Sequence, residues 1–265
     1  PQFFPAVPAI FNAINAHRHV DDYDLTSLRY CISGGAPLPT EVKKTFEEKT
    51  GCVLVEGYGL TESPPVACVN PTEGANKPAS IGLPLPETQI ELHDTETGRL
   101  IESPHTRGEI WIKGPQVMKG YWKKPEETAN VITVDGFLRT GDVAEFDEDG
   151  YLFIVDRIKD LILVNGYNVY QRVIEEAIYK HPATEECVVA GIKDANRGEV
   201  PKVWIKLKED RRMSELDLKE FLKDKISPIE MPRYIEFRDT PLPKTMIGKL
   251  SKKDLLAQEA AKNKT

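Results

Sequence analysis

The hydrophobic pattern changes twice along the chain, and these changes limit the fold more than any single motif. In the first part, helical spacing of apolar residues over 6–17 and 40–50 alternates with short apolar runs at 28–33 and 52–57. Thr40 is typical of a helix start, and Gly51 of a helix end. We therefore predict an α/β segment over about residues 1–78.

The second part, about residues 79–156, has short runs with a strand period of two, separated by turns. Examples are residues 88–94, 108–114 and 143–155, the last of which contains the turn dipeptide Asp149-Gly150. This pattern predicts a small β-barrel or sandwich. We take residues 1–156 together as one large domain.

In the third part, residues 161–265, helices and strands mix again. A helical apolar stripe lies over 173–178, strand patterns lie at 186–192, 202–207 and 233–237, and Ser214 caps a further helix. We predict a separate, small α+β domain. Charged residues at 157–160 interrupt two apolar runs, so we place the boundary and a hinge there.

Composition excludes several classes of protein. The 265 residues correspond to about two domains at roughly 150 residues each. No apolar run approaches the roughly 18 residues of a membrane span. The net charge is −7, without a basic stripe, which argues against nucleic acid as a partner. The scattered cysteines suit buried free thiols in a reducing cytoplasm better than a metal site or disulfides: Cys31, Cys52, Cys68 and Cys187. The chain starts at Pro1 without a signal segment, so we expect a piece of a longer cytoplasmic protein.

The stretch GYGLTESPP, residues 57–65, is rich in glycine and proline, and we expect a loop there rather than a helix or a central strand. Thr61 and Glu62 provide a hydroxyl and a carboxylate, which suit Mg²⁺ beside the phosphates of a nucleotide. Gly57 allows a ligand to approach the backbone, and Tyr58 offers a flat face to a base. The alternative is an ordinary turn with a solvated glutamate.

Two further motifs suit a nucleotide. The run SGGAP, residues 33–37, follows an apolar strand, where open α/β sheets bind ligands; a simple strand-to-helix connection is the alternative. Asp142 follows Thr140-Gly141, and its carboxylate can accept hydrogen bonds from both hydroxyls of a ribose; the alternative is a turn-forming aspartate.

Three basic residues stand out in the third part of the chain. Arg157 is a candidate for contact with ribose or phosphate, and Lys159 for a solvated hinge; a polar linker without a role is the alternative. Lys249 follows Gly248 in a lysine-rich segment, where it can project its charge into a cleft or belong to a solvated face.

The order of these motifs resembles the acyl-adenylate-forming superfamily, which contains acyl-CoA synthetases, adenylation domains of peptide synthetases and beetle luciferases. The resemblance covers almost the whole chain, through SGGAP, GYGLTE, GEIWIKGPQVMKGYW, DGFLRTGD, DEDGYLFIVDRIKDLILVNGYNVY and PKTMIGK. The run over residues 149–170 is most similar to fatty-acid CoA ligases. It implies a medium- or long-chain fatty acid that is first adenylated with ATP and Mg²⁺ and then transferred to CoA.

The resemblance also implies roles for individual residues. Thr61 would contact phosphate, and Glu62 would hold Mg²⁺. Asp142 would bind the ribose, helped by Arg157. Five residues would line the adenine site: Gly35, Ala36, Glu56, Gly57 and Tyr58.

For the third part of the chain, the resemblance implies that Lys249 bridges the acyl carboxylate and the α-phosphate during adenylation. Lys159 would be the hinge about which the small domain turns between the two half-reactions. Gly166 and Tyr167 would then line the channel for the pantetheine arm of CoA.

The chain departs from the family pattern in two places. No segment matches the Ser/Thr/Gly-rich loop, ending in Pro-Lys-Gly, that grips the β- and γ-phosphates, so we expect a C-terminal fragment that is inactive alone. Gln171 stands where fatty-acid ligases more often have proline, and we expect it only to alter the start of a helix. The alternatives are an aryl or 4-coumarate-type CoA ligase, a carrier-protein adenylation enzyme, or a non-catalytic nucleotide-binding module.

Overall fold

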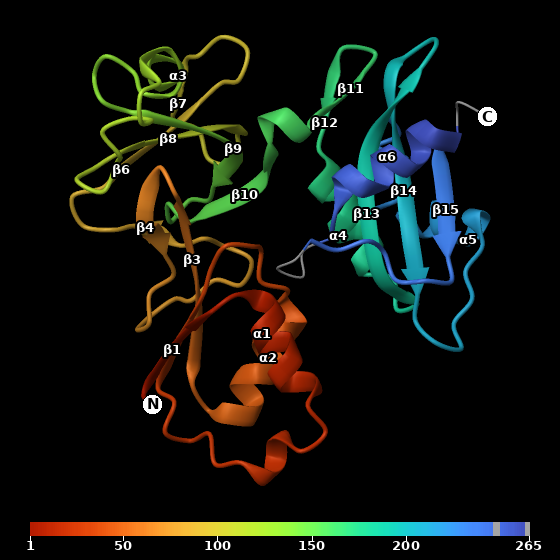
Figure 1. The fold of residues 1–265 in the computed structure, drawn as a ribbon, viewed down its shortest axis with the longest axis horizontal. Coiled ribbons are helices and arrows are strands. Elements are labelled where there is room, and N and C mark those ends of the chain that lie inside the picture. The colour runs from red at the N-terminus through yellow and green to blue at the C-terminus, as the bar shows by residue number, and fades with distance from the viewer. Residues whose placement is uncertain (246–249, 263–265) are drawn as a thin grey trace. The chain divides into compact units, whose positions relative to one another are not determined.

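The computed structural model describes residues 1–245 and 250–262. It is a mixed α/β structure with several sheets, and it divides into two compact units, Pro1–Ile154 (unit 1) and Val155–Thr265 (unit 2) (Figure 1).

The first sheet of unit 1 has the strand order β1-β2-β3-β4-β5. Strands β1 to β3 are parallel, and β4 and β5 continue the sheet antiparallel. Its strands are β1 (Phe3–Ala6), β2 (Tyr30–Ser33), β3 (Val53–Leu60), β4 (Ser63–Val69) and β5 (Leu83–Pro84).

Two helices pack together in this part of unit 1, and they confirm the α/β pattern of the sequence. Helix α1 (Pro8–Ala16) meets α2 (Thr40–Thr50) through the buried rings of Phe11 and Phe46, whose centroids lie 4.9 Å apart. Gly51 ends α2 in the left-handed conformation, as predicted. A short 3-10 helix, η1 (Val20–Asp22), follows α1.

The prediction of a loop over residues 57–65 is wrong. This segment lies in the β3–β4 hairpin, and β3 is the central strand of its sheet. Strand β3 changes partner at this point: it pairs with β2 up to Glu56 and with β4 from Gly57 onward. The prolines are tolerated because the β3–β4 register shifts between Tyr58 and Leu60. A Cβ on Gly59 would lie 2.4 Å from the Pro65 carbonyl oxygen, so the hairpin requires glycine there.

The second sheet of unit 1 has the order β10-β9-β8-β6-β7, and its strand β10 continues past Ile154 into the first residues of unit 2. Helix α3 (Pro125–Val131) lies between β8 and β9 in the chain. The expected β-barrel is wrong: among the described residues no pairing joins β7 to β10, and β7 is too short to close the sheet. The strands are β6 (Gln89–His93), β7 (Leu100–Ile101), β8 (Gly108–Lys113), β9 (Leu138–Phe146) and β10 (Leu152–Arg157).

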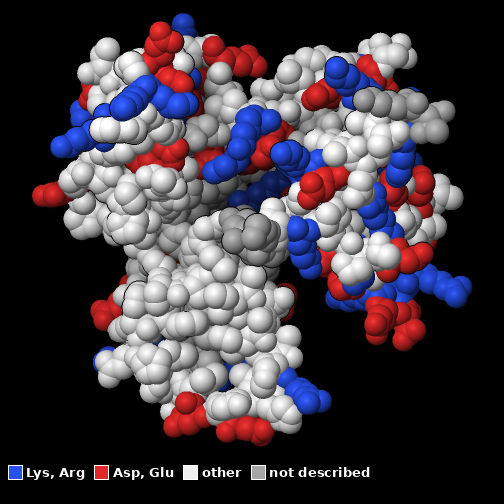
Figure 2. Space-filling view, viewed as in Figure 1, with Lys and Arg blue, Asp and Glu red and all other residues white. Residues whose placement is uncertain are grey.

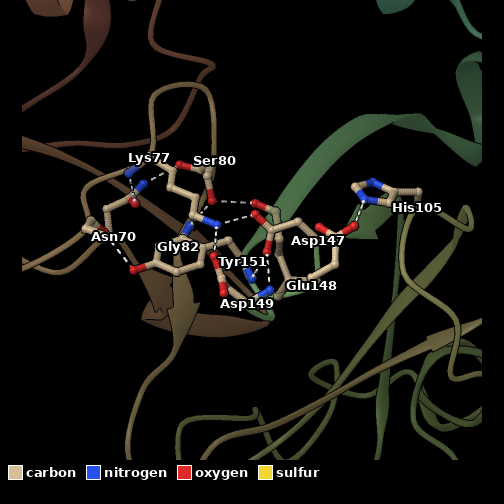
Figure 3. A network of polar contacts seen from close by, with 11 residues as sticks. Asn70, Lys77, Ser80, Gly82, His105, Asp147, Glu148, Asp149 and Tyr151 are labelled. Carbon is tan, nitrogen blue, oxygen red and sulfur yellow. Dashed lines mark hydrogen bonds and ion pairs between the residues drawn. The ribbon is translucent and has the colours of Figure 1, made fainter.

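A polar network ties the two sheets of unit 1 together (Figure 3). The ammonium group of Lys77 lies 2.5 Å from Asp147 and 2.6 Å from Asp149, and 4.4 Å from the centre of the Tyr151 ring. The Tyr151 hydroxyl donates to the Ala75 carbonyl. These bonds fix the segment after β4 onto the β9–β10 turn that Asp149-Gly150 predicted.

Unit 2 is built on a sheet of order β12-β11-β14-β13, with β15 parallel to β14. Helices α4 and α5 cover one face, where Ile174 and Leu218 are buried, and α6 covers the other, where Trp204 and Leu255 are buried. The elements are β11 (Ile162–Val164), β12 (Tyr167–Val169), α4 (Gln171–Tyr179), β13 (Thr184–Asp194), β14 (Gly198–Leu207), α5 (Glu215–Leu222), β15 (Tyr234–Arg238), α6 (Lys252–Lys262) and the 3-10 helix η2 (Ile158–Asp160).

All four cysteines are free and buried, which confirms the prediction of buried free thiols. Within the described part of the chain, every helix is too short or too polar to cross a membrane.

Candidate functional site

The carboxyl ends of β2 and β3 bring two of the predicted motifs together. Ser33 at the end of β2 is the register partner of Glu56 on β3. The Leu38 backbone N–H donates to Glu56 Oε1 over 3.1 Å, which fastens the segment after β2 to the glutamate. A Cβ on Gly34 would lie 3.4 Å from the Gly57 carbonyl oxygen, so the two backbones are in close contact. Parallel strands in open α/β sheets bind ligands at this edge.

The residues predicted to contact adenine differ in their exposure to solvent. Glu56, Gly57 and Tyr58 are buried on β3, whereas Gly35 is exposed and Ala36 is partly exposed. Gly35 has φ +76°, a conformation that favours glycine. The bend after β2 therefore exposes the main chain of Gly35 to solvent.

Asp142 lies on β9 and is joined to this group by Tyr58. The Tyr58 hydroxyl donates to Asp142 Oδ2 over 2.6 Å, and Asp142 is only 2% exposed. Burial, followed by the negative charge of Asp142, raises the pKa of Tyr58 well above its ordinary value. The Asp142 backbone N–H donates to the Thr140 hydroxyl. Two segments that the sequence analysis singled out separately thus meet in one contact.

Thr61 and Glu62 form the turn between β3 and β4, where Thr61 is exposed and Glu62 is partly buried. The Tyr121 hydroxyl donates to Glu62 Oε1 over 2.8 Å, and the Met118 N–H donates to the Glu62 carbonyl over 2.8 Å. The hydrogen bond to Glu62, more than burial, raises the pKa of Tyr121. Sequence reasoning missed Tyr121, although it lies in the run GYW that contributed to the family resemblance.

The residues around Glu62 fit one particular kind of metal site. Among the described residues, no group of three or more histidine, cysteine, aspartate or glutamate side chains is placed to hold a metal ion. Mg²⁺ keeps several waters and is often bound by one or two carboxylates together with substrate phosphates. A single oriented carboxylate beside an exposed hydroxyl therefore fits Mg²⁺ bound with a nucleotide, and does not fit a metal held by protein alone.

In unit 2, Arg157 and Lys159 are exposed, and Lys159 lies in η2. Asn165 and Gly166, with φ of +52° and +83°, join β11 to β12 in a tight hairpin, and Tyr167 beside them is 66% exposed. An Asn-Gly pair between two apolar runs is a strong hairpin signal, which the sequence analysis did not use. Lys249 lies outside the described residues.

Gln171 is the first residue of α4, and it does more than alter the start of that helix. Its side chain is 5% exposed, donates to the Asp160 carbonyl and accepts from the Lys252 ammonium group. One side chain thereby joins η2, α4 and α6 within unit 2, which a proline at this position could not do.

Comparisons with known proteins show which family the sequence resembles. The family model of the AMP-binding enzyme matches residues 1–122, and that of the AMP-binding enzyme C-terminal domain matches residues 173–249. A long-chain-fatty-acid–CoA ligase of Bacillus subtilis (strain 168) is 48% identical over 98% of this chain, which corresponds to 46% of the relative. The chain thus spans about half the length of the curated relatives it matches.

Solved structures of related enzymes have a similar fold. ATP-bound MatB from Rhodopseudomonas palustris superposes with a TM-score of 0.87 at 32% identity, covering 97% of this chain and 50% of that one. The anthranilate CoA ligase AuaEII in complex with anthranoyl-AMP gives a TM-score of 0.83 at 30% identity, over 98% of this chain and 51% of that one. Because the models for both parts of one family match in order along the sequence, the chain belongs to the AMP-binding enzymes.

Proposed function

We propose that this chain is part of an AMP-forming fatty-acid CoA ligase, which adenylates a medium- or long-chain fatty acid with ATP and then transfers the acyl group to CoA. The observation that carries the proposal is the bond between Tyr58 and Asp142. It holds a buried carboxylate next to the glycine-rich ends of β2 and β3. The long-chain-fatty-acid–CoA ligase of Bacillus subtilis supports the choice of acid.

The nucleotide would be held mainly by unit 1. Asp142 would accept hydrogen bonds from the ribose hydroxyls, with Arg157 as a second contact. Thr61 would donate its hydroxyl to a phosphate oxygen. The adenine would lie against the backbone of Gly35, Ala36, Glu56 and Gly57 and the ring of Tyr58.

Adenylation requires two anions to approach each other, because a carboxylate attacks an α-phosphate that is itself negative. Lys249 would lie between the two groups and neutralise part of this charge. Glu62 would hold Mg²⁺, which, when bound, withdraws electron density from the phosphate oxygens. The carboxylate oxygen then forms the new bond to phosphorus, and pyrophosphate leaves.

Thioester formation needs a second arrangement. The CoA thiol would attack the acyl carbon, form the C–S bond, lose its proton and release AMP. We propose Lys159 as the hinge for this change, and Gly166 and Tyr167 as part of the channel for CoA. The domains would be residues 1–156 and 161–265. Since no segment matches the loop for the β- and γ-phosphates, we expect activity to require residues beyond this chain. Free thiols suit a reducing compartment, so we also propose a cytoplasmic location.

A second candidate is a CoA ligase for an aromatic acid. AuaEII, an anthranilate CoA ligase in complex with anthranoyl-AMP, superposes over nearly the whole chain. This candidate uses the same nucleotide residues and differs only in the acid.

Pyrophosphate release tests the proposal. The full-length protein would be incubated with ATP, Mg²⁺ and either fatty acids of graded length or aromatic acids, beside its Lys249→Ala variant and this chain alone. We expect release that depends on a fatty acid and is lost in the variant and in this chain. Release with aromatic acids alone would favour the second candidate, and no release with any acid would refute both.

A further inference from the structure

We propose that Tyr121 is a positioning residue for Mg²⁺, which acts by fixing the carboxylate of Glu62. This inference rests on the proposed function, in which Glu62 holds the metal beside the phosphates of ATP. Tyr121 lies 59 positions from Glu62 in the sequence, on the segment between β8 and α3.

The segment that carries Tyr121 holds Glu62 at two points. The Tyr121 hydroxyl donates to Oε1 of the carboxylate, and the Met118 N–H donates to the carbonyl oxygen of the same glutamate, each over 2.8 Å. The second bond fixes the backbone of Glu62 and the first fixes the end of its side chain. A flexible glutamate at the tip of a hairpin is thereby restricted to one orientation.

Tyr121 is itself held by helix α3. Its backbone N–H donates to the Thr128 hydroxyl over 2.9 Å, and that hydroxyl donates to the Lys124 carbonyl over 2.8 Å. Gly120 has φ +143°, and a Cβ there would lie 2.7 Å from the Thr128 methyl group. The chain can pass this close to α3 only with glycine at this position, and this brings the tyrosine ring towards Glu62.

The chemistry of metal-bound carboxylates gives this contact a function. Carboxylates that bind metals are usually fixed by hydrogen bonds from neighbouring groups, and loss of such a bond costs about 10- to 100-fold in metal affinity. A phenol hydroxyl occupies one side of Oε1 and leaves the remaining lone pairs of the carboxylate for the cation. Glu62 then pays less side-chain entropy when Mg²⁺ binds.

A tyrosine with a purely structural role provides a matched control. Tyr151 donates its hydroxyl to the Ala75 carbonyl in the network of Figure 3. Tyr121→Phe and Tyr151→Phe each remove one hydroxyl and one hydrogen bond from unit 1. Only the first changes a contact to a proposed metal ligand.

The experiment measures the Kd for ATP by calorimetry, in EDTA and over a range of Mg²⁺ concentrations, in the full-length protein. We expect Tyr121→Phe to keep the wild-type Kd in EDTA and to need about 10- to 100-fold more Mg²⁺ for the same gain in affinity. Thr128→Val should show a smaller shift in the same direction, Thr128→Ser should behave as wild type, and Tyr151→Phe should be unchanged. Glu62→Gln should lose most of the gain.

Three results would overturn the inference, and they are distinguishable. If Glu62→Gln loses the effect of Mg²⁺ while Tyr121→Phe keeps it, Glu62 holds the metal and Tyr121 does not position it. If ATP binds the wild-type protein equally well in EDTA and Mg²⁺, the proposed role of Glu62 is wrong as well. Equal weakening of ATP binding in EDTA and in Mg²⁺ by Tyr121→Phe would show a structural role only, and would also refute the inference.

Discussion

The Tyr58 hydroxyl lies 2.6 Å from Asp142 Oδ2, and this bond joins the first sheet of unit 1 to the second. Both residues are buried, at 8% and 2% exposure. Burying a carboxylate is costly unless hydrogen-bond donors surround it, and Tyr58 supplies one such donor to Asp142. The same contact sets the direction of the carboxylate that we propose for ribose binding.

Removal of the Tyr58 hydroxyl tests how much its bond to Asp142 contributes to stability. We expect Tyr58→Phe to lower the free energy of unfolding of this chain by about 1.5–3 kcal/mol, the usual range for a hydrogen bond to a charged group. Urea titration followed by circular dichroism measures the change. Tyr167→Phe, at a side chain that is 66% exposed, is the control and should change stability by less than about 0.5 kcal/mol. Equal stability of Tyr58→Phe and wild type would show that the bond between Tyr58 and Asp142 does not stabilise the fold.

The sequence predicted Tyr58 and Asp142 individually but not their contact. Their types and motifs are local information, whereas a bond across 84 positions depends on which sheets pack together. Tyr121 was missed for the same reason, since nothing near it in the sequence points to Glu62. Helix ends such as Gly51 and strands such as β14 were predictable because periodicity and end signals are local.

Two errors in the fold prediction have a common physical cause. In the sequence, the prolines and glycines of residues 57–65 argue against a central strand, but a shift of register and a change of partner accommodate them in the structure. The alternating runs after residue 79 were correctly predicted as strands, but barrel closure depends on pairing between the first and last edges of a sheet. Both features are set by partners that lie far away in the sequence.

Glu175 gives unit 2 a specific dependence on pH. Its carboxylate lies between α4 and β13 and accepts one hydrogen bond from the Val189 N–H over 2.7 Å. Burial raises its pKa from an ordinary 4.5 to about 7, more than the Val189 bond and the charge of Lys252 lower it. The folded state therefore holds this proton more tightly than the unfolded state.

Because the folded state binds this proton more tightly than the unfolded state, the stability of unit 2 should decrease as the pH rises. The stabilising contribution of the Glu175 proton is fully present below pH 4.5 and is lost as the pH rises to about 7. The free energy of unfolding should therefore fall by up to about 3 kcal/mol as the pH rises through this range, because each pKa unit corresponds to about 1.4 kcal/mol. We expect Glu175→Gln to remove this fall. Urea unfolding at pH 5 and pH 7.5, monitored by the buried Trp204, measures it. Glu176→Gln changes the exposed neighbour and should keep the wild-type difference in unfolding free energy between the two pH values. The same difference in Glu175→Gln would show that Glu175 does not cause it.

The thiols should be unreactive in the folded chain. Burial raises the pKa of Cys31 to about 12, helped by Cys52, whose sulfur lies 3.6 Å away, and it raises the pKa of Cys68 to about 12. The thiolate is the reactive form, so we expect almost no reaction with Ellman's reagent at pH 8 in native buffer and four thiols in denaturant. A fast-reacting thiol in native buffer would contradict the burial of these residues.

The surface around β1 and α1 should cause this chain to self-associate. Phe3, Val7 and Ile10 are 56%, 37% and 44% exposed, and Figure 2 shows few charged side chains over these elements. Contiguous exposed apolar surface favours association. We expect the weight-average mass from light scattering to rise with concentration, and Phe3→Glu with Ile10→Lys to reduce the rise. Leu216→Glu removes a single apolar side chain, 78% exposed, from α5 in unit 2, and should leave the association unchanged. A constant monomer mass for the wild-type chain at high concentration would show that this surface does not bind itself.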